Sequence, residues 1–267
     1  MSDNYITINE QQYKYPSQSN KINELLKTNS DGSKNNKTIH SIIIPKCISS
    51  ISDYRFKYLY DLNYLDMSNS DISSIPMYMC IKCENLNTIK LPSSLMYINI
   101  GAFRDCKSLR DIKIPKMVNT ISSECFENCE NLIFVTFEDN SELRTISNHA
   151  FNNCKSISEF IIPRNVYDIG MEAFANCNSL KAIGMSYFTY DKAVGPFMKC
   201  INETSYDLKY DLSYFGLKGE WEILHINSFT STNNVNNREY IIGRFKHCDI
   251  VLINKSIYSR NYDSYKL

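Results

Sequence analysis

Cysteine and histidine are the residue types in this sequence whose spacing could support chemistry. Cys80 and Cys83 form a CxxC motif, which is the spacing of half a zinc site or of a redox pair. His247 and Cys248 are neighbours and could act as a metal-binding or nucleophilic pair. The sequence has no second CxxC motif, and no partner for the His247–Cys248 pair can be identified. We therefore interpret both pairs as buried packing residues.

The other signatures of catalysis are missing from the sequence. It contains no P-loop, no Gly-x-Gly-x-x-Gly motif, no nucleophile elbow and no HExxH motif, which are short patterns with a known mechanism. His40, His149 and His225 are scattered along the chain. We expect a protein that is not an enzyme and that holds no metal or cofactor. An enzyme with a site in the C-terminal segment is the least favoured alternative.

Composition and charge narrow the class of protein further. The 267 residues carry 29 Lys and Arg against 29 Asp and Glu, so the formal net charge is zero. No global field therefore attracts nucleic acid or anionic lipid. The N-terminus does not read as a secretion signal, and no uncharged apolar run approaches the roughly 20 residues of a spanning helix. These features predict a cytoplasmic protein with reduced thiols, no membrane span and no nucleic-acid partner.

Six of the ten cysteines recur at a nearly constant interval. Successive members of this column are 23, 23, 25, 23 and 23 residues apart: Cys83, Cys106, Cys129, Cys154, Cys177 and Cys200. With the cysteine as slot 0, phenylalanine recurs at slot −3, and apolar residues recur at slots +3, +6, +8, +12 and +15. The pattern also extends backward, so about seven coils begin near residues 36, 59, 83, 106, 129, 154 and 177. A fixed period of this length indicates a solenoid.

The spacing within each coil predicts its local structure. Apolar residues at slots +6 and +8 with a polar residue between them indicate a short strand with one buried face. Proline often follows at slot +9, as Pro92, Pro115 and Pro163 do, and ends the strand because it has no N–H to donate. Stacked coils would place parallel strands about 4.8 Å apart. We expect an α/β-type repeat solenoid with a parallel sheet of short strands, mostly β and irregular elsewhere.

Three stretches carry a resemblance to a known family. They read LPSSLMYINIGAFRDCKSL, IPKMVNTISSECFENCENL and IPRNVYDIGMEAFANCNSL, and correspond to residues 91–109, 114–132 and 162–180. They resemble the unit of the BspA-type leucine-rich repeat, and the resemblance extends over about residues 36–200. It implies a leucine-rich repeat stack with a binding role, since proteins of this family are typically surface or secreted adhesion molecules.

The strand face is the surface on which such solenoids usually bind a partner. Its outward side chains at slots +4, +5 and +7 include a basic cluster next to an apolar one. The predicted partner-binding residues are Tyr64, Lys90, Arg110, Lys113, Ile133, Phe134, Glu159 and Ile161. Apolar groups rimmed by charge are typical of a protein interface. Alternatively, the C-terminal segment folds over these residues.

We divide the chain into three parts on composition. Residues 1–35 are a flexible polar arm or an N-terminal cap, residues 36–200 are the solenoid, and residues 201–267 are degenerate repeats or a small β-rich C-terminal cap. The expected function is that of an intracellular adaptor that binds a protein. The alternative is a surface adhesin or antigen that binds host or matrix proteins and reaches the surface by an unconventional route. End-to-end self-association of the solenoid is a further expectation.

Overall fold

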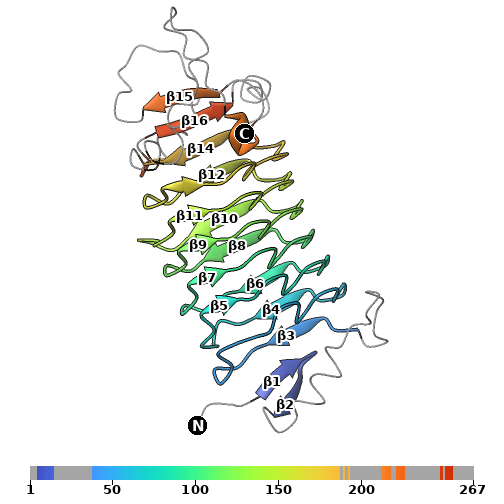
Figure 1. The fold of residues 1–267 in the computed structure, drawn as a ribbon. Coiled ribbons are helices and arrows are strands. Elements are labelled where there is room, and N and C mark those ends of the chain that lie inside the picture. The colour runs from blue at the N-terminus through green and yellow to red at the C-terminus, as the bar shows by residue number, and fades with distance from the viewer. Residues whose placement is uncertain are drawn as a thin grey trace, which may run out of the picture.

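The chain winds into a stack of similar coils with parallel strands (Figure 1). The structure is a computed structural model that describes residues 5–14, 38–186, 189, 192, 212–217, 221–225, 247–248 and 250–254. Its elements are β1 (Tyr5–Ile8), β2 (Gln11–Lys14), β3 (Ser41–Ile43), β4 (Tyr64–Asp66), β5 (Ser74–Ile75), β6 (Thr88–Lys90), β7 (Tyr97–Ile98), β8 (Asp111–Ile114), β9 (Thr120–Ile121), β10 (Phe134–Phe137), β11 (Thr145–Ile146), β12 (Glu159–Ile161), β13 (Asp168–Ile169), β14 (Ala182–Met185), the 3-10 helix η3 (Ser213–Phe215), β15 (Trp221–His225) and β16 (Ile250–Asn254). The prediction of a solenoid with a parallel sheet of short strands is confirmed.

The predicted strand of each coil occupies slots +5 to +7 or +8. Strands β3, β4 and β6 pair in parallel, and equal slots face one another, as Ser41, Tyr64 and Thr88 do. The same register relates β8 to β10 and β12 to β14. Hydrogen bonding along this column is interrupted twice, between β6 and β8 and between β10 and β12. The second interruption falls at the coil that has 25 residues.

A second column of strands runs along the return path of the coils. Strands β5, β7, β9, β11 and β13 pair in parallel as one five-stranded sheet. Each of them is two residues long. Two residues are too few to show an alternating pattern, so the sequence analysis missed this sheet and gave the return path only as apolar slots.

Between the two columns of strands, residues of the same type from successive coils stack on one another. The rings of Phe103, Phe126, Phe151 and Phe174 form a continuous stack with centroid separations of 5.5, 5.4 and 5.7 Å. Leucine, isoleucine and cysteine columns run beside it, and most members are fully buried. Since a lone coil could not bury these side chains, each coil depends on its neighbours for stability.

The cysteine column has a polar role as well as a packing role. Each thiol donates to the carbonyl oxygen at slot −3 of the preceding coil, as from Cys129 Sγ to Phe103 O at 3.2 Å. The equivalent bonds of Cys83, Cys106, Cys154 and Cys177 span 3.0 to 3.4 Å. Burial raises the pKa of the Cys129 thiol well above its ordinary value and raises the pKa of Cys177 to about 12. Cysteine therefore recurs because it is small, apolar and able to donate one weak hydrogen bond.

Two backbone positions in each coil have a left-handed conformation. Slots −5 and −1 both have positive φ in six successive coils, and this set comprises Tyr54 and Tyr58, Tyr78 and Lys82, Gly101 and Asp105, Glu124 and Asn128, His149 and Asn153, and Glu172 and Asn176. Only glycine and, to a lesser degree, asparagine adopt this conformation at little cost. The coils therefore turn their corners through strained residues, which the stacking between coils must hold in place.

Antiparallel strand pairs lie at both ends of the stack. Strands β1 and β2 pair with each other, and β1 pairs antiparallel with β3. At the other end β16 pairs antiparallel with both β14 and β15. Residues 212–217 continue the corner of the stack, because Glu172 N donates to Tyr214 O and Phe174 N to Phe215 O. The division of the chain at residues 35 and 200 stays a prediction.

The left-handed corners generate a stability prediction. Lys82 has a φ of 60°, whereas the same slot holds asparagine in three later coils. We expect Lys82→Asn to raise the free energy of unfolding by about 1 kcal/mol, since asparagine tolerates the left-handed region better than lysine. The matched control Lys116→Asn alters an exposed residue outside the positive-φ set and should change stability by less than about 0.5 kcal/mol. Chemical denaturation of both variants measures the difference, and equal effects would contradict the strain at the corner.

The buried thiols generate a reactivity prediction. Cys47 is exposed, whereas Cys83, Cys106, Cys129, Cys154 and Cys177 are buried. Because the thiolate is the reactive form and burial disfavours it, iodoacetamide should modify Cys47 in the folded protein and leave the five column thiols intact until denaturant is added. Peptide mass spectrometry at increasing reaction times measures the order of modification. Modification of Cys129 as fast as Cys47 would show that the column opens readily.

Candidate partner-binding surface

The outer face of the strand column carries the eight predicted partner-binding residues. Slots +5 and +7 point outward on each strand, while slot +6 enters the core. Four of the predicted residues are exposed on this face: Lys90, Arg110, Lys113 and Phe134. The other four are half-buried: Tyr64, Ile133, Glu159 and Ile161. The structure thus places all eight along one surface, but only half of them present most of their side chain to a partner.

Tyr64, Asp66 and Lys90 form a hydrogen-bonded group at the N-terminal end of this face. Tyr64 Oη donates to Asp66 Oδ2 at 2.7 Å, and Lys90 Nζ lies 3.3 Å from the same oxygen. The ammonium also lies 5.4 Å from the centroid of the Tyr64 ring. Burial alone would raise the pKa of Asp66, but hydrogen bonds from Ser68, Tyr64 and Lys90 lower it overall. Asp66 is thus a carboxylate that holds Tyr64 and Lys90 in fixed positions.

The predicted basic cluster is partly neutralised by neighbouring carboxylates. Lys113 Nζ lies 3.3 Å from Glu138 Oε1, and the other oxygen of Glu138 accepts from Lys116 N at 3.1 Å. The hydrogen bond from Lys116 N is the main cause of the lowered pKa of Glu138. Within the described part of the chain, Arg110 has no such partner. Arg110 is therefore the cation of this face that is free to bind.

The C-terminal segment covers one end of the face. Ala182, Cys248, Val251 and Ile253 form a small buried cluster on the outer side of β14 and β16, and Ile161 packs against it. Phe134 lies outside this cover, and 54% of its surface is exposed. The apolar cluster that the sequence analysis placed here is thus divided, with Ile161 covered and Phe134 open. The unbroken apolar run at residues 250–253 of β16, which is buried on both faces, is the sequence signal for this cover.

A polar hollow lies beside these residues at the start of β6 and β8. Its volume is about 420 Å³, and its lining consists of Asn87, Thr88, Ser108, Arg110, Asp111 and Asn131. Of this set the sequence analysis singled out only Arg110 as a binding residue. The others lie at slots +2, +4 and +5, where polar residues on any solenoid look alike in sequence.

The cysteine pairs lie in packed surroundings. Cys80 and Cys83 are fully buried, and Cys83 Sγ donates to Phe56 O at 3.0 Å. Cys248 belongs to the small cluster under the C-terminal segment. Over the described ranges, no group of three or more His, Cys, Asp or Glu residues could hold a metal ion.

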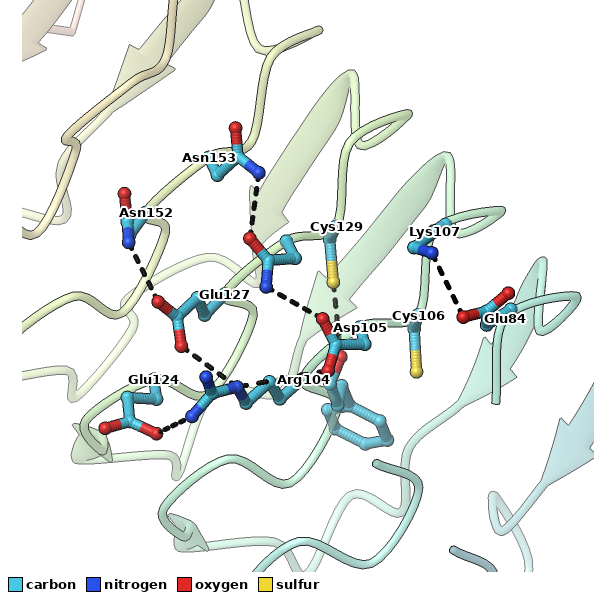
Figure 2. A network of polar contacts seen from close by, with 12 residues as sticks. Glu84, Arg104, Asp105, Cys106, Lys107, Glu124, Glu127, Cys129, Asn152 and Asn153 are labelled. Atoms are coloured by element: carbon cyan, nitrogen blue, oxygen red, sulfur yellow. Dashed lines mark hydrogen bonds and ion pairs between the residues drawn. The ribbon is translucent and has the colours of Figure 1, made fainter. Parts of the chain in front are cut away.

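A ladder of polar side chains links the corners of the coils and was missed by the sequence analysis. Arg104 forms ion pairs with Glu124 and with Glu127, the latter at 3.0 Å (Figure 2). Asn153, Asn128 and Asp105 then form a chain of hydrogen bonds of 2.8 and 2.7 Å across three coils. These side chains are occupied by one another, so this corner stabilises the stack and offers little to a ligand.

Solved structures of similar proteins support the fold. A leucine rich cell surface protein of Faecalibacterium prausnitzii has a TM-score of 0.51 at 24% identity, over 64% of this chain and 44% of that one. A leucine-rich repeat protein of Bacteroides ovatus has a TM-score of 0.51 at 28% identity, over 56% of this chain and 37% of that one. The aligned part thus covers less than half the length of either relative. No curated protein matches the chain.

The expectation of a cytoplasmic protein is wrong. The F. prausnitzii protein, which has the same repeat fold, is described as a cell surface protein. The expectation depended on the reading of the N-terminus and on reduced thiols. The nine cysteines in the described residues form no disulfide, and all but Cys47 are buried. Buried thiols are unreactive in any compartment, so these cysteines do not indicate one.

The family follows from the sequence of the repeats. The profile of the BspA type leucine rich repeat region matches residues 27–143 and 134–251 in six copies, which is well over half of the chain. Among the described residues no helix is long and apolar enough to cross a membrane. The chain belongs to the BspA-type leucine-rich repeat family.

Proposed function

We propose that this protein is a non-catalytic surface module that binds another protein through the outer face of its strand column. The observation that carries the proposal is the exposed ring of Phe134, which is 54% open on a sheet whose other apolar residues are mostly buried. Arg110 and Lys113 flank it on the neighbouring strand segment. An aromatic side chain beside exposed cations is a typical centre of a protein interface.

The rigidity of the face supports this proposal. Phe134 lies opposite Asp111 in the parallel ladder of β8 and β10. Ile112 and Ile114 of β8 are buried, and Val135 and Phe137 of β10 are partly buried against the same core. Such a face loses little conformational entropy when it binds, because its backbone is already ordered. The partner would therefore meet a surface that is already in its binding geometry.

Adhesion to host or matrix proteins is the form of this function that we propose. The similar protein of F. prausnitzii is described as a cell surface protein, and repeats of this family are typically non-catalytic. We propose no reaction for the C-terminal segment. End-to-end self-association would pair β2 or β15, which are the outermost strands at the two ends of the stack.

The binding face can be tested by capture. We expect the double variant Phe134→Asp, Lys113→Glu to lose at least about tenfold in affinity for a partner from a panel of extracellular matrix proteins, because it removes a central aromatic group and reverses a flanking charge. The matched control Tyr97→Asp, Lys116→Glu makes the same charge changes at exposed residues outside this face. Surface plasmon resonance on both variants, with circular dichroism to verify folding, measures the effect. Equal losses in the two variants would exclude this face.

The surface location can be tested on intact cells. A membrane-impermeant biotin reagent should label this protein on whole cells of its native source, because the exposed amines of Lys90, Lys113 and Lys116 would react with it. A cytoplasmic enzyme serves as the control for leakage. Labelling that occurs only after lysis would contradict the proposed surface role.

A further inference from the structure

The strand ladder is interrupted at the place where the polar hollow lies. In other pairs of successive coils, the N–H at slot +4 donates to the carbonyl oxygen at slot +4 of the preceding coil. These bonds run from Asn63 N to His40 O, from Asn87 N to Asn63 O and from Ile133 N to Arg110 O. Between β6 and β8, which lie side by side (Figure 1), the described residues give Arg110 N no such bond to Asn87 O. One hydrogen-bonded sheet ends at β6, and another begins at β8. A backbone donor and a backbone acceptor are thus left open beside the hollow.

The side chains of the hollow also have unused hydrogen-bonding capacity. The charged groups at slot +1 of these coils are paired, as Lys107 is with Glu84 at 3.0 Å and Lys155 with Glu130 at 2.9 Å. Within the described part of the chain, no side-chain hydrogen bond or ion pair engages Ser108, Arg110, Asp111 or Asn131. Four unpartnered polar side chains from two successive coils therefore face one cavity of about 420 Å³.

The remaining two lining residues complete a ring of donors and acceptors. Thr88 Oγ1 donates to Asn87 Oδ1 at 2.8 Å, which leaves the Asn87 amide N–H groups available. The lining therefore offers donors from Arg110 and the two asparagines, an acceptor in the Asp111 carboxylate, and hydroxyls that do both. A ligand that satisfies them must itself carry several groups that both donate and accept, close together on a small frame.

An aromatic face stands next to this ring of polar groups. Phe134 is the cross-strand partner of Asp111 in a parallel pair, and neighbouring strands lie about 4.8 Å apart. Its ring is exposed and can cover the apolar C–H face of a flat ligand. A hydroxyl rim with one apolar face is the chemistry of a pyranose sugar.

We propose that the hollow between β6 and β8 binds a sugar unit of a carbohydrate, with Asp111, Arg110 and Asn131 bonding its hydroxyls and Phe134 stacking on its face. The inference rests on the proposed function, since it uses the same strand face and names a carbohydrate on the partner as the group recognised. The volume of the hollow, about 420 Å³, lies within the range of about 300–1,000 Å³ that is usual for small-ligand sites. All six lining residues are polar, so an apolar side chain of a peptide would leave their hydrogen-bonding groups unsatisfied.

Saturation-transfer NMR with the full chain tests the site directly. The probes are the methyl glycosides of galactose, glucose, mannose, fucose and N-acetylglucosamine. We expect at least one glycoside to receive saturation from the wild-type protein, and its affinity to fall about tenfold in Asp111→Ala, because a hydrogen bond to a charged group is lost. The matched control is Asp139→Ala, which removes an exposed carboxylate that does not line the hollow. Circular dichroism verifies the fold of both variants.

The outcomes separate this inference from the proposed function. Lys113 does not line the hollow, so Lys113→Glu should keep sugar binding even where it weakens capture of a protein partner. If no glycoside binds the wild type, or if Asp111→Ala binds as well as Asp139→Ala, the sugar site is refuted. Capture of a protein that persists without any sugar signal would refute this inference and leave the protein-binding role in place.

Discussion

The register between successive coils is the constraint on which the rest of this structure depends. Each coil must bring its strand back beside the same strand of the coil before, so that slot +5 faces slot +5 along β3, β4 and β6. The chain achieves this return through two left-handed residues at fixed places in each coil. These corners are unfavourable for most residues, and they persist because the stacked phenylalanines and the backbone ladders hold both sides of each turn.

The same constraint explains why polar groups pair in columns. When one residue type recurs at a slot, identical side chains of successive coils become neighbours. Apolar rings and amides stabilise the stack in this arrangement, whereas equal charges repel each other. The chain alternates Glu84, Lys107, Glu130 and Lys155 at slot +1, and the adjacent members Glu84 and Lys107 bond at 3.0 Å. The charges at this slot are thus paired between successive coils. Arg110 and Asp111 have no such side-chain partner among the described residues, and they lie in one hollow beside the open ladder, which makes them candidates for binding.

Buried thiols connect the fold to the location of the protein. A cysteine at slot 0 satisfies a carbonyl of the preceding coil and is closed to solvent. Its raised pKa keeps it in the unreactive thiol form. A chain of this kind can keep reduced cysteines in an oxidising compartment, and for this reason the expectation of a cytoplasmic protein did not follow from its cysteines.

The sequence alone determined the period, the buried slots and the strand in each coil, because these depend on which residue type recurs at which spacing. Cys106, Phe126 and Ile112 each had a place in the repeat that the structure confirms as core. Only the tertiary structure decided which outward-facing side chains are exposed and unpaired, and so available to bind a partner. Lys113 pairs with Glu138 from the next coil, Ile161 lies under the C-terminal segment, and Arg110 borders a break in the ladder. Exposure and pairing depend on residues about 23 positions away or more, and a pattern within one coil carries no information about them.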